Sequence, residues 1–348
     1  MTHCAFKGSR SRSLTTLAGL MSFAGLMAVP ALSQAQVVAG DTASVQVLLS
    51  EGVLNPTTVA VRDNVAFLVE GQLSLIGQVA NPFQVVTVAL DGTGLLADTV
   101  QLPGADFFPE GIGLDATTND LFVGSVVTGS VVKIPAGTFT AEEFAAPAPA
   151  VLARGAVGLE VNEANNVVFV CDSNPNVAGA TLTGLNLADA SVAVTHQFPG
   201  ANDFCNDVTF DAAGNLFVTE SATGQIFTIA AANVLTPNSL QLLVATPGIA
   251  PLAEGGVGAN GIAFASGGLF VANTDAGTIV RFDPAAADVA ATETIVNVSE
   301  NNAANTLLSG PDGITPISET ELLVVENGLA GALQNRLVKL TLDPIVQQ

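Results

Sequence analysis

Four residues with oxygen-bearing side chains occupy equivalent places in a repeated sequence pattern. They are Glu110, Asn206, Asn260 and Asp312, and each stands two residues before an apolar residue within a strand-like run. Carboxylate and amide oxygens are the ligands that hard divalent cations such as Ca²⁺ prefer. The set therefore predicts a divalent-cation site, most simply for Ca²⁺, if the fold brings the four side chains together.

A local explanation competes with the metal site. Asn and Asp are common turn residues before strands, and Asn-Gly and Asp-Gly are ordinary loop dipeptides. This reading accounts for Asn206, Asn260 and Asp312. It accounts poorly for Glu110, because Glu is not a preferred turn residue. Both explanations stay open at the level of the sequence.

A sixfold repeat supplies the elements that would position these residues. Each repeat has an apolar start, a turn rich in Asn, Asp or Gly, a strongly apolar segment and, in most repeats, a further strand-like run. Its apolar anchor residues lie roughly 50 residues apart, about the length of one four-stranded propeller blade. These anchors are Val59, Ile112, Leu159, Val208, Ile262 and Ile314.

The repeat predicts an all-β fold, a six-bladed β-propeller with four-stranded antiparallel blades. Residues alternate with period two, as in Val208 and Phe210, which favours strands over helices. The last repeat ends after its third strand near Leu342, so we expect an N-terminal run at residues 44–50 to supply the outer strand and close the ring. The positions two residues before the anchors then lie at the starts of the innermost strands. Thr57 and Val157 take this position in the other two repeats.

The first 35 residues have the pattern of a secretory signal. Basic residues precede an apolar run at residues 14–29, and small residues follow up to Ala35. The sequence thus predicts a signal peptide at residues 1–35, a single propeller domain at residues 36–348, and export to the periplasm or the extracellular space. We expect no membrane association after cleavage, and a monomer.

Charge and cysteine usage agree with an exported domain. The chain has 31 acidic and 9 basic residues, a net charge of −22, which excludes a nucleic-acid partner. Only Cys171 and Cys205 follow the predicted signal. In an oxidising compartment they could form a disulfide, although two buried thiols are an equally good reading.

The four oxygen-bearing motifs carry a family resemblance. Glu110-Gly111-Ile112, Asn206-Asp207-Val208, Asn260-Gly261-Ile262 and Asp312-Gly313-Ile314 resemble the ordered metal-binding motifs of the gluconolactonase, regucalcin and senescence-marker-protein superfamily of six-bladed propellers. Paraoxonases and related lactonases are similar in arrangement. The specific part of the resemblance is limited to these four short motifs.

The resemblance implies a catalytic divalent cation held by Glu110, Asn260 and Asp312, with Asn206 as a ligand or substrate contact. Such a cation would polarise the carbonyl of a lactone or ester substrate. By the same analogy Asp312 is the leading candidate for the general base. Asp207 is a second candidate and a possible substrate contact, although on an extended strand its side chain should point away from Asn206.

The chain also departs from the family. Sugar lactonases carry an arginine near the first Asn motif, whereas Asp203, Phe204 and Cys205 occupy that stretch here. No basic residue stands beside a motif, which favours a neutral or apolar small-molecule substrate. His196 is the one histidine after the signal, and we interpret it as a surface or structurally satisfied residue.

Two classes of function remain. The first is an exported, metal-dependent hydrolase of lactones or esters. The second is a non-catalytic propeller, similar to NHL-type repeats, that binds a protein, glycan or small molecule, because propellers host many functions. Glu110 discriminates between them, since a scaffold has little need for a carboxylate at the ring axis.

Overall fold

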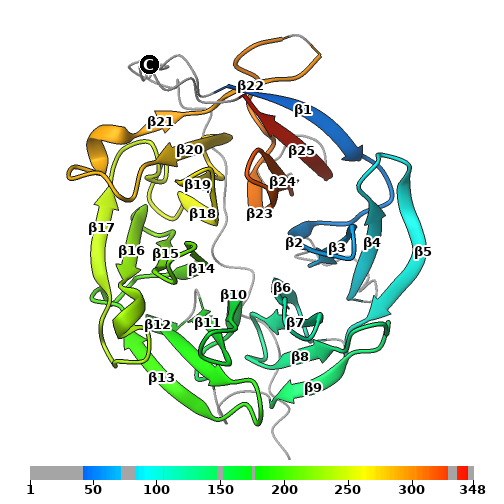
Figure 1. Cartoon of the computed structure of the whole chain (residues 1–348), viewed down its shortest axis with the longest axis vertical. Helices are drawn as coiled ribbons and strands as arrows, with labels where there is room; N and C mark the ends of the chain where they lie inside the picture. Colours follow the sequence, from blue (N-terminus) through cyan, green and yellow to red (C-terminus); the bar gives the residue numbers. More distant parts are fainter. Residues whose placement is uncertain are drawn as a thin grey trace, which may run out of the picture.

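The computed structural model describes residues 42–71, 83–104, 106–146, 152–174, 177–301, 303–327 and 335–343. The predicted signal peptide lies outside these residues. In the described part the chain forms six β-sheets arranged as blades around a common axis, which confirms the predicted six-bladed propeller (Figure 1). No helix in these residues is long and apolar enough to cross a membrane.

Five blades are four-stranded antiparallel sheets in which sequence order is spatial order, from the axis outwards. The first consists of β2 (Pro56–Arg62), β3 (Val65–Glu70), β4 (Gln84–Ala89) and β5 (Gly94–Gln101). The second consists of β6 (Pro109–Asp115), β7 (Asp120–Ser125), β8 (Val131–Ile134) and β9 (Glu142–Ala145). The third consists of β10 (Ala156–Asn162), β11 (Val167–Asn174), β12 (Val177–Asn186) and β13 (Val192–Gln197).

The next two blades repeat this order. The fourth consists of β14 (Cys205–Phe210), β15 (Leu216–Glu220), β16 (Gln225–Ile229) and β17 (Gln241–Ala245). The fifth consists of β18 (Ala259–Ala265), β19 (Gly268–Asn273), β20 (Thr278–Phe282) and β21 (Thr294–Ile295). Short 3₁₀ turns, η1 (Ala231–Asn233) and η2 (Ala290–Thr292), precede the outer strands of these two blades.

The sixth blade combines both ends of the described chain. It contains β23 (Pro311–Ser318), β24 (Glu321–Glu326) and β25 (Arg336–Leu342), and β1 (Thr42–Leu49) pairs antiparallel with β25. A short strand, β22 (Asn297–Ser299), adds to β1 in parallel orientation. Arg336 lies in this blade and donates to the carboxylates of Glu326 and Glu300.

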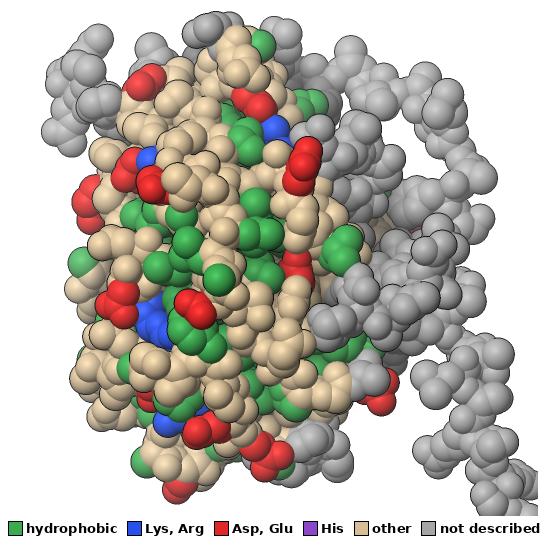
Figure 2. Space-filling model, turned by 90° about the vertical axis from the view of Figure 1, so that its right-hand side faces the viewer, with side chains coloured by type: hydrophobic (Ala, Val, Ile, Leu, Met, Phe, Trp, Pro, Cys, Tyr) green, Lys and Arg blue, Asp and Glu red, His purple; other side chains and the backbone are tan. Residues whose placement is uncertain are grey.

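Apolar packing lies between the blades. Each of six clusters is built from the facing sheets of two neighbours: Phe67 of blade one packs in one cluster with Ile112 of blade two, and Val208 of blade four packs in another with Phe169 of blade three. A four-stranded sheet buries both faces in this way only inside a ring. Figure 2 shows acidic side chains scattered over one side of the ring.

Candidate metal centre

The innermost strands of all six blades begin with the same irregularity. The first residue of each strand pairs with the end of the second strand, and the register then shifts before the anchor, as between Pro109 and Ile112. The residue two before each anchor lies inside this bulge. The structure therefore places the following residues at equivalent positions of six strands around the axis: Thr57, Glu110, Val157, Asn206, Asn260 and Asp312.

The glycines of these motifs are explained by close packing rather than by turns. Gly111, Gly261 and Gly313 lie within strands, and a Cβ on any of them would collide with the backbone of the next blade. For Gly261 the obstacle is the carbonyl oxygen of Asp312. The turn explanation for the Asn-Gly and Asp-Gly motifs is thus wrong, because these dipeptides let neighbouring inner strands approach each other at the axis.

Hydroxyl groups from the preceding blade hold three of the four strands that carry the oxygen ligands, β6, β18 and β23. Thr57 Oγ1 donates to the carbonyl of Glu110 over 2.9 Å, and Thr219 Oγ1 donates to the carbonyl of Asn260 over 2.6 Å. Ser221 Oγ donates to the carbonyl of Ala259 over 2.6 Å, and Thr274 Oγ1 to that of Pro311 over 2.7 Å. The starts of β6, β18 and β23 are therefore fixed relative to the preceding blade.

Asn260 and Asp312 are connected to each other and to their surroundings. Both are buried, with exposed fractions of 6% and 5%. Asn327 Nδ2 donates to Asp312 Oδ2 over 2.5 Å, and the Asn260 side chain is also hydrogen-bonded to the Asp312 carboxylate. Asn260 Nδ2 donates to Thr274 Oγ1 over 2.8 Å. These two side chains are held in place before any ligand binds.

Glu110 and Asn206 have their side chains free for a ligand. Within the part of the chain that the structure describes, neither the Glu110 carboxylate nor the Asn206 amide forms a hydrogen bond with a protein group. Asn206 is nevertheless buried, with an exposed fraction of 7%. Its amide atoms are not among the polar atoms that are sealed from solvent without a partner, so water or a ligand can reach them.

The carboxylates near the axis act on each other electrostatically. Burial raises the pKa of Glu110 to about 7, with a further contribution from the charge of Asp207. Burial also raises the pKa of Asp312 well above its ordinary value, and the charges of Glu110 and Asp207 add to this. No cationic side chain is among the groups that shift these pKa values. A positive ligand would stabilise their ionised forms.

Asp207 has a structural task that its sequence position did not reveal. Its Oδ1 accepts the N–H of Val208 over 2.9 Å, and its Oδ2 accepts the N–H of Ile262 in the next blade over 3.1 Å. Burial raises its pKa to about 7. Because both oxygens are occupied, Asp207 joins blades four and five beside Asn206, at the position that glycine occupies in four other blades.

Glu160 is a carboxylate near the axis that the motif comparison missed. It follows the anchor Leu159 in β10, and burial together with the charges of Asp207 and Glu163 raises its pKa to about 8. A single acid in the otherwise apolar run Gly158-Leu159-Glu160-Val161 was the available signal. It belongs to the one blade with an apolar residue, Val157, in the ligand position.

Two acidic residues in the second strands bind the backbone of nearby loops. Glu220 is fully buried, and its carboxylate accepts the N–H groups of Phe204, Ala222 and Thr223. Asp172 accepts the N–H groups of residues 153–155 in the same way. Each carboxylate fixes the loop that leads into an inner strand.

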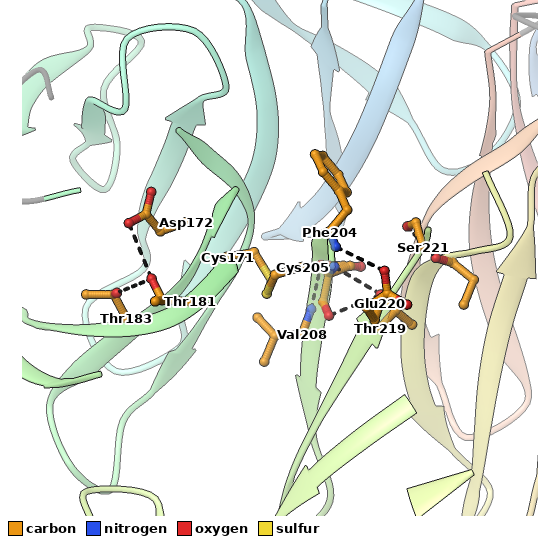
Figure 3. Close-up of a disulfide and its surroundings, with 12 residues drawn as sticks. Cys171, Asp172, Thr181, Thr183, Phe204, Cys205, Val208, Thr219, Glu220 and Ser221 are labelled. Carbon is orange, nitrogen blue, oxygen red and sulfur yellow. Dashed lines mark hydrogen bonds between the residues drawn. A yellow bond between two sulfur atoms is a disulfide. The ribbon is translucent and has the colours of Figure 1, made fainter. Parts of the chain in front are cut away.

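The histidine and the two cysteines are also structural. His196 is buried between the carbonyl of Val234 and the N–H of Ser239, which uses both ring nitrogens, so it is satisfied but does not lie on the surface. Cys171 and Cys205 form a disulfide with a Cα–Cα distance of 5.2 Å. It joins β11 of blade three to the first residue of β14, next to Asn206 (Figure 3).

The donor set fits a hard divalent cation. Two carboxylates and two amides lie at equivalent positions near the starts of the inner strands of blades two, four, five and six. Glu110 and Asn206 have no side-chain hydrogen bond with a protein group among the described residues. In the same residues no three His, Cys, Asp and Glu side chains form a metal site by themselves. A cation would therefore depend on amide oxygens as well as carboxylates, which is usual for Ca²⁺.

Comparisons with known proteins support the fold. No protein-family model matches the chain, and no curated protein matches it. Solved structures with similar folds include a virginiamycin B lyase from Staphylococcus aureus in complex with quinupristin (13% identity, TM-score 0.55), which covers 86% of this chain and 99% of its own. A luciferin-regenerating enzyme has 10% identity and a TM-score of 0.59, and the match covers 86% of this chain and 95% of the enzyme. A PQQ-bound aldose sugar dehydrogenase from Streptomyces coelicolor has 12% identity and a TM-score of 0.57, and the match covers 86% of this chain and 98% of the dehydrogenase.

Proposed function

We propose that this chain is an exported, divalent-cation-dependent hydrolase of lactones or esters. The observation that carries the proposal is the pair Glu110 and Asp312, two carboxylates on inner strands of the ring. Burial raises the pKa of both, the charge of Glu110 raises that of Asp312 further, and no cationic side chain is among the groups that shift them. Together with the oxygens of Asn206 and Asn260 they would hold Ca²⁺ or a similar ion. The bound cation would supply Lewis-acid polarisation of the substrate carbonyl.

The residues of the chain have separate tasks in this proposal. Asp312 is the general base, because burial raises its pKa well above the ordinary value and thus makes it a better proton acceptor from water. Asn327 orients it through the hydrogen bond to Oδ2. Asn206 contacts the cation or the substrate. Asp207 remains beside the substrate position, but its hydrogen bonds to two backbone N–H groups make it a weaker base candidate.

The face at which the inner strands begin suits a neutral or apolar substrate. Arg154, the basic residue before β10, is paired with Asp172 at 3.5 Å. Large apolar side chains are exposed in loops of the same face, where inner strands start or second strands end. They are Leu54, Val127, Leu252 and Leu307. Buried carboxylates at the axis would also repel an anionic substrate.

Export is supported by the disulfide, since such bonds persist in oxidising compartments. The similar folds belong to a lyase, a dehydrogenase and a luciferin-regenerating enzyme by their names. One fold thus hosts different chemistries, and the choice of hydrolysis rests on the site.

Calorimetric titration of the mature chain with Ca²⁺, Mg²⁺, Mn²⁺ and Zn²⁺ tests the cation site. We expect binding that Glu110→Gln and Asp312→Asn weaken at least tenfold, with Glu142→Gln, an exposed acid of β9, as control. Absence of divalent binding would refute the proposal. If the cation binds but a panel of lactones and esters shows no metal-dependent turnover, the site serves a non-catalytic binding module instead.

A further inference from the structure

We propose that Thr274 is a positioning residue that turns the carbonyl oxygen of Asn260 towards the ring axis and thereby makes this amide a cation ligand. The inference rests on the proposed function and deepens it. It identifies the hydrogen bonds that decide which atom of the amide is offered to a ligand.

The hydroxyl of Thr274 has one hydrogen, and the structure shows where it goes. Thr274 lies directly after β19, is buried, and its Oγ1 is 2.7 Å from the carbonyl oxygen of Pro311. A backbone carbonyl only accepts hydrogen bonds, so the hydroxyl must donate to it. Thr274 Oγ1 can therefore interact with a second group only as an acceptor.

The second group at this hydroxyl is the side-chain amide of Asn260, at 2.8 Å. Because Thr274 must accept, the atom of Asn260 that faces it must be the NH₂ group. The Asn260 side chain is also hydrogen-bonded to the Asp312 carboxylate, which likewise only accepts when ionised. Both contacts use the NH₂ group, and the remaining polar atom, Oδ1, is left for a ligand.

This arrangement selects the sign of the ligand charge. An amide that presents its NH₂ group would bind an anion or a carbonyl, whereas one that presents Oδ1 binds a cation. Without the Thr274 hydroxyl, the Asn260 amide loses one of the two acceptors that hold its NH₂ group and is free to rotate, so that Oδ1 no longer faces the ligand. Hydrogen-bonded partners of metal ligands typically contribute 10–100-fold to metal affinity.

Ser221 provides a matched control. It lies directly after β15, one blade earlier than Thr274, and its Oγ donates to the carbonyl of Ala259 over 2.6 Å. Ser221→Ala therefore removes the same kind of bond between neighbouring blades. In contrast to Thr274, Ser221 has no hydrogen bond with a ligand side chain among the described residues.

The test combines two measurements on the full mature chain. The first follows the Asn260 NH₂ signals in the cation-free protein after ¹⁵N-asparagine labelling, with assignment by their loss in Asn260→Asp. We expect two distinct, exchange-protected protons in the wild type, Thr274→Ser and Ser221→Ala, and averaged, rapidly exchanging protons in Thr274→Val. The second measures the Kd for Ca²⁺ by calorimetry, where we expect about a tenfold increase in Thr274→Val alone.

Each contrary outcome would refute a specific part of the proposal about Thr274. Unchanged NH₂ signals and Kd in Thr274→Val would refute the positioning role. An equal loss of affinity in Ser221→Ala would show that packing between blades, rather than amide orientation, controls binding. If the wild type binds no divalent cation, the proposed function and the ligand role of Asn260 both fail, while the NH₂ signals still decide the orientation of the amide.

Discussion

The chemistry of Glu110 depends on its surroundings. In a solvated loop its carboxylate would be an ordinary acid, but here burial and the charge of Asp207 raise its pKa to about 7. Burial also raises the pKa of Asp207 to about 7 and, together with the charges of Asp207 and Glu163, that of Glu160 to about 8. Folding therefore favours the protonated forms of these acids, and a positively charged ligand would stabilise their ionised forms.

The cation-free protein should therefore lose stability as the pH rises from about 4.5 to about 8. A carboxyl group with a raised folded-state pKa stabilises the fold fully below its unfolded pKa, and this contribution is lost as the pH passes the folded-state value. For Glu110 we expect a loss of about 1–3 kcal/mol. Chemical unfolding at pH 4, 6 and 8 in the presence of a chelator measures it.

Glu110→Gln provides the matching variant. It should unfold at a higher denaturant concentration than the wild type at pH 8 and at a similar one at pH 4, because the amide carries no charge to desolvate. Addition of Ca²⁺ should reverse the order at pH 8. A stability of the wild type that does not change between pH 4 and pH 8 would contradict the electrostatic account.

At the scale of the elements, the site depends on the close approach of the inner strands. Each ligand residue lies in the bulge near the start of its inner strand. In blades two, five and six the next residue is a glycine, which leaves room for the backbone of the neighbouring blade. Hydroxyls such as Thr219 and buried acids such as Glu220 then fix the strand starts and the loops before them. A substitution that forces these inner strands apart should affect stability and cation affinity together.

Gly261→Ala tests the approach of blades five and six. Its Cβ would collide with the backbone of Asp312 and Gly313, so we expect a loss of about 2–4 kcal/mol of stability and weaker Ca²⁺ binding. Gly137→Ala is the control: Gly137 has a φ of +71° but open space for a Cβ, so it should cost only about 1–2 kcal/mol and leave Ca²⁺ affinity unchanged. Equal effects of the two variants would argue against the steric explanation.

The disulfide makes a second element-level prediction. Cys171 and Cys205 are 34 residues apart in the sequence, so removing the bond should cost about 3–4 kcal/mol by the loop-entropy model. Unfolding of a Cys171→Ala/Cys205→Ala variant, with and without reductant, measures this. The wild type should become sensitive to reductant and the variant should not. A wild type that is unaffected by complete reduction would contradict a stabilising role.

At the scale of the whole molecule, the sixth blade joins the two ends of the chain. β1 pairs with both β25 and β22, and its side chains belong to the apolar cluster between blades five and six. The strand thus completes a sheet and covers part of the core. Without it, β25 would have an open edge that invites association.

Deletion of residues 42–49 should consequently open the ring. We expect a lower and broader thermal unfolding transition, together with higher-order species in size-exclusion chromatography. A synthetic peptide of residues 42–49 added in trans should restore part of the stability. A monomeric deletion variant with unchanged unfolding would show that β1 is dispensable.

Much of this architecture was predictable from local patterns. The spacing of the anchors, from Val59 to Ile314, follows from the sixfold repeat, and it placed Glu110, Asn206, Asn260 and Asp312 at equivalent positions. The tasks of Asp207, Glu160 and Glu220 were not predictable, because they depend on contacts with other strands, loops and blades. Sequence alternation predicts that a side chain leaves a strand on one face, but not which group it meets.

The sequence by itself determined the number of blades, the strand order and the residue types at the ring axis, because these follow from periodicity and spacing along one chain. Only the tertiary structure decided that Cys171 bonds to Cys205, that the motif glycines serve packing between blades, and that Thr274 faces the NH₂ group of Asn260. The physical reason is that hydrogen-bond direction, burial and electrostatic coupling arise between blades. They are set by distances in space between residues that are far apart in the chain.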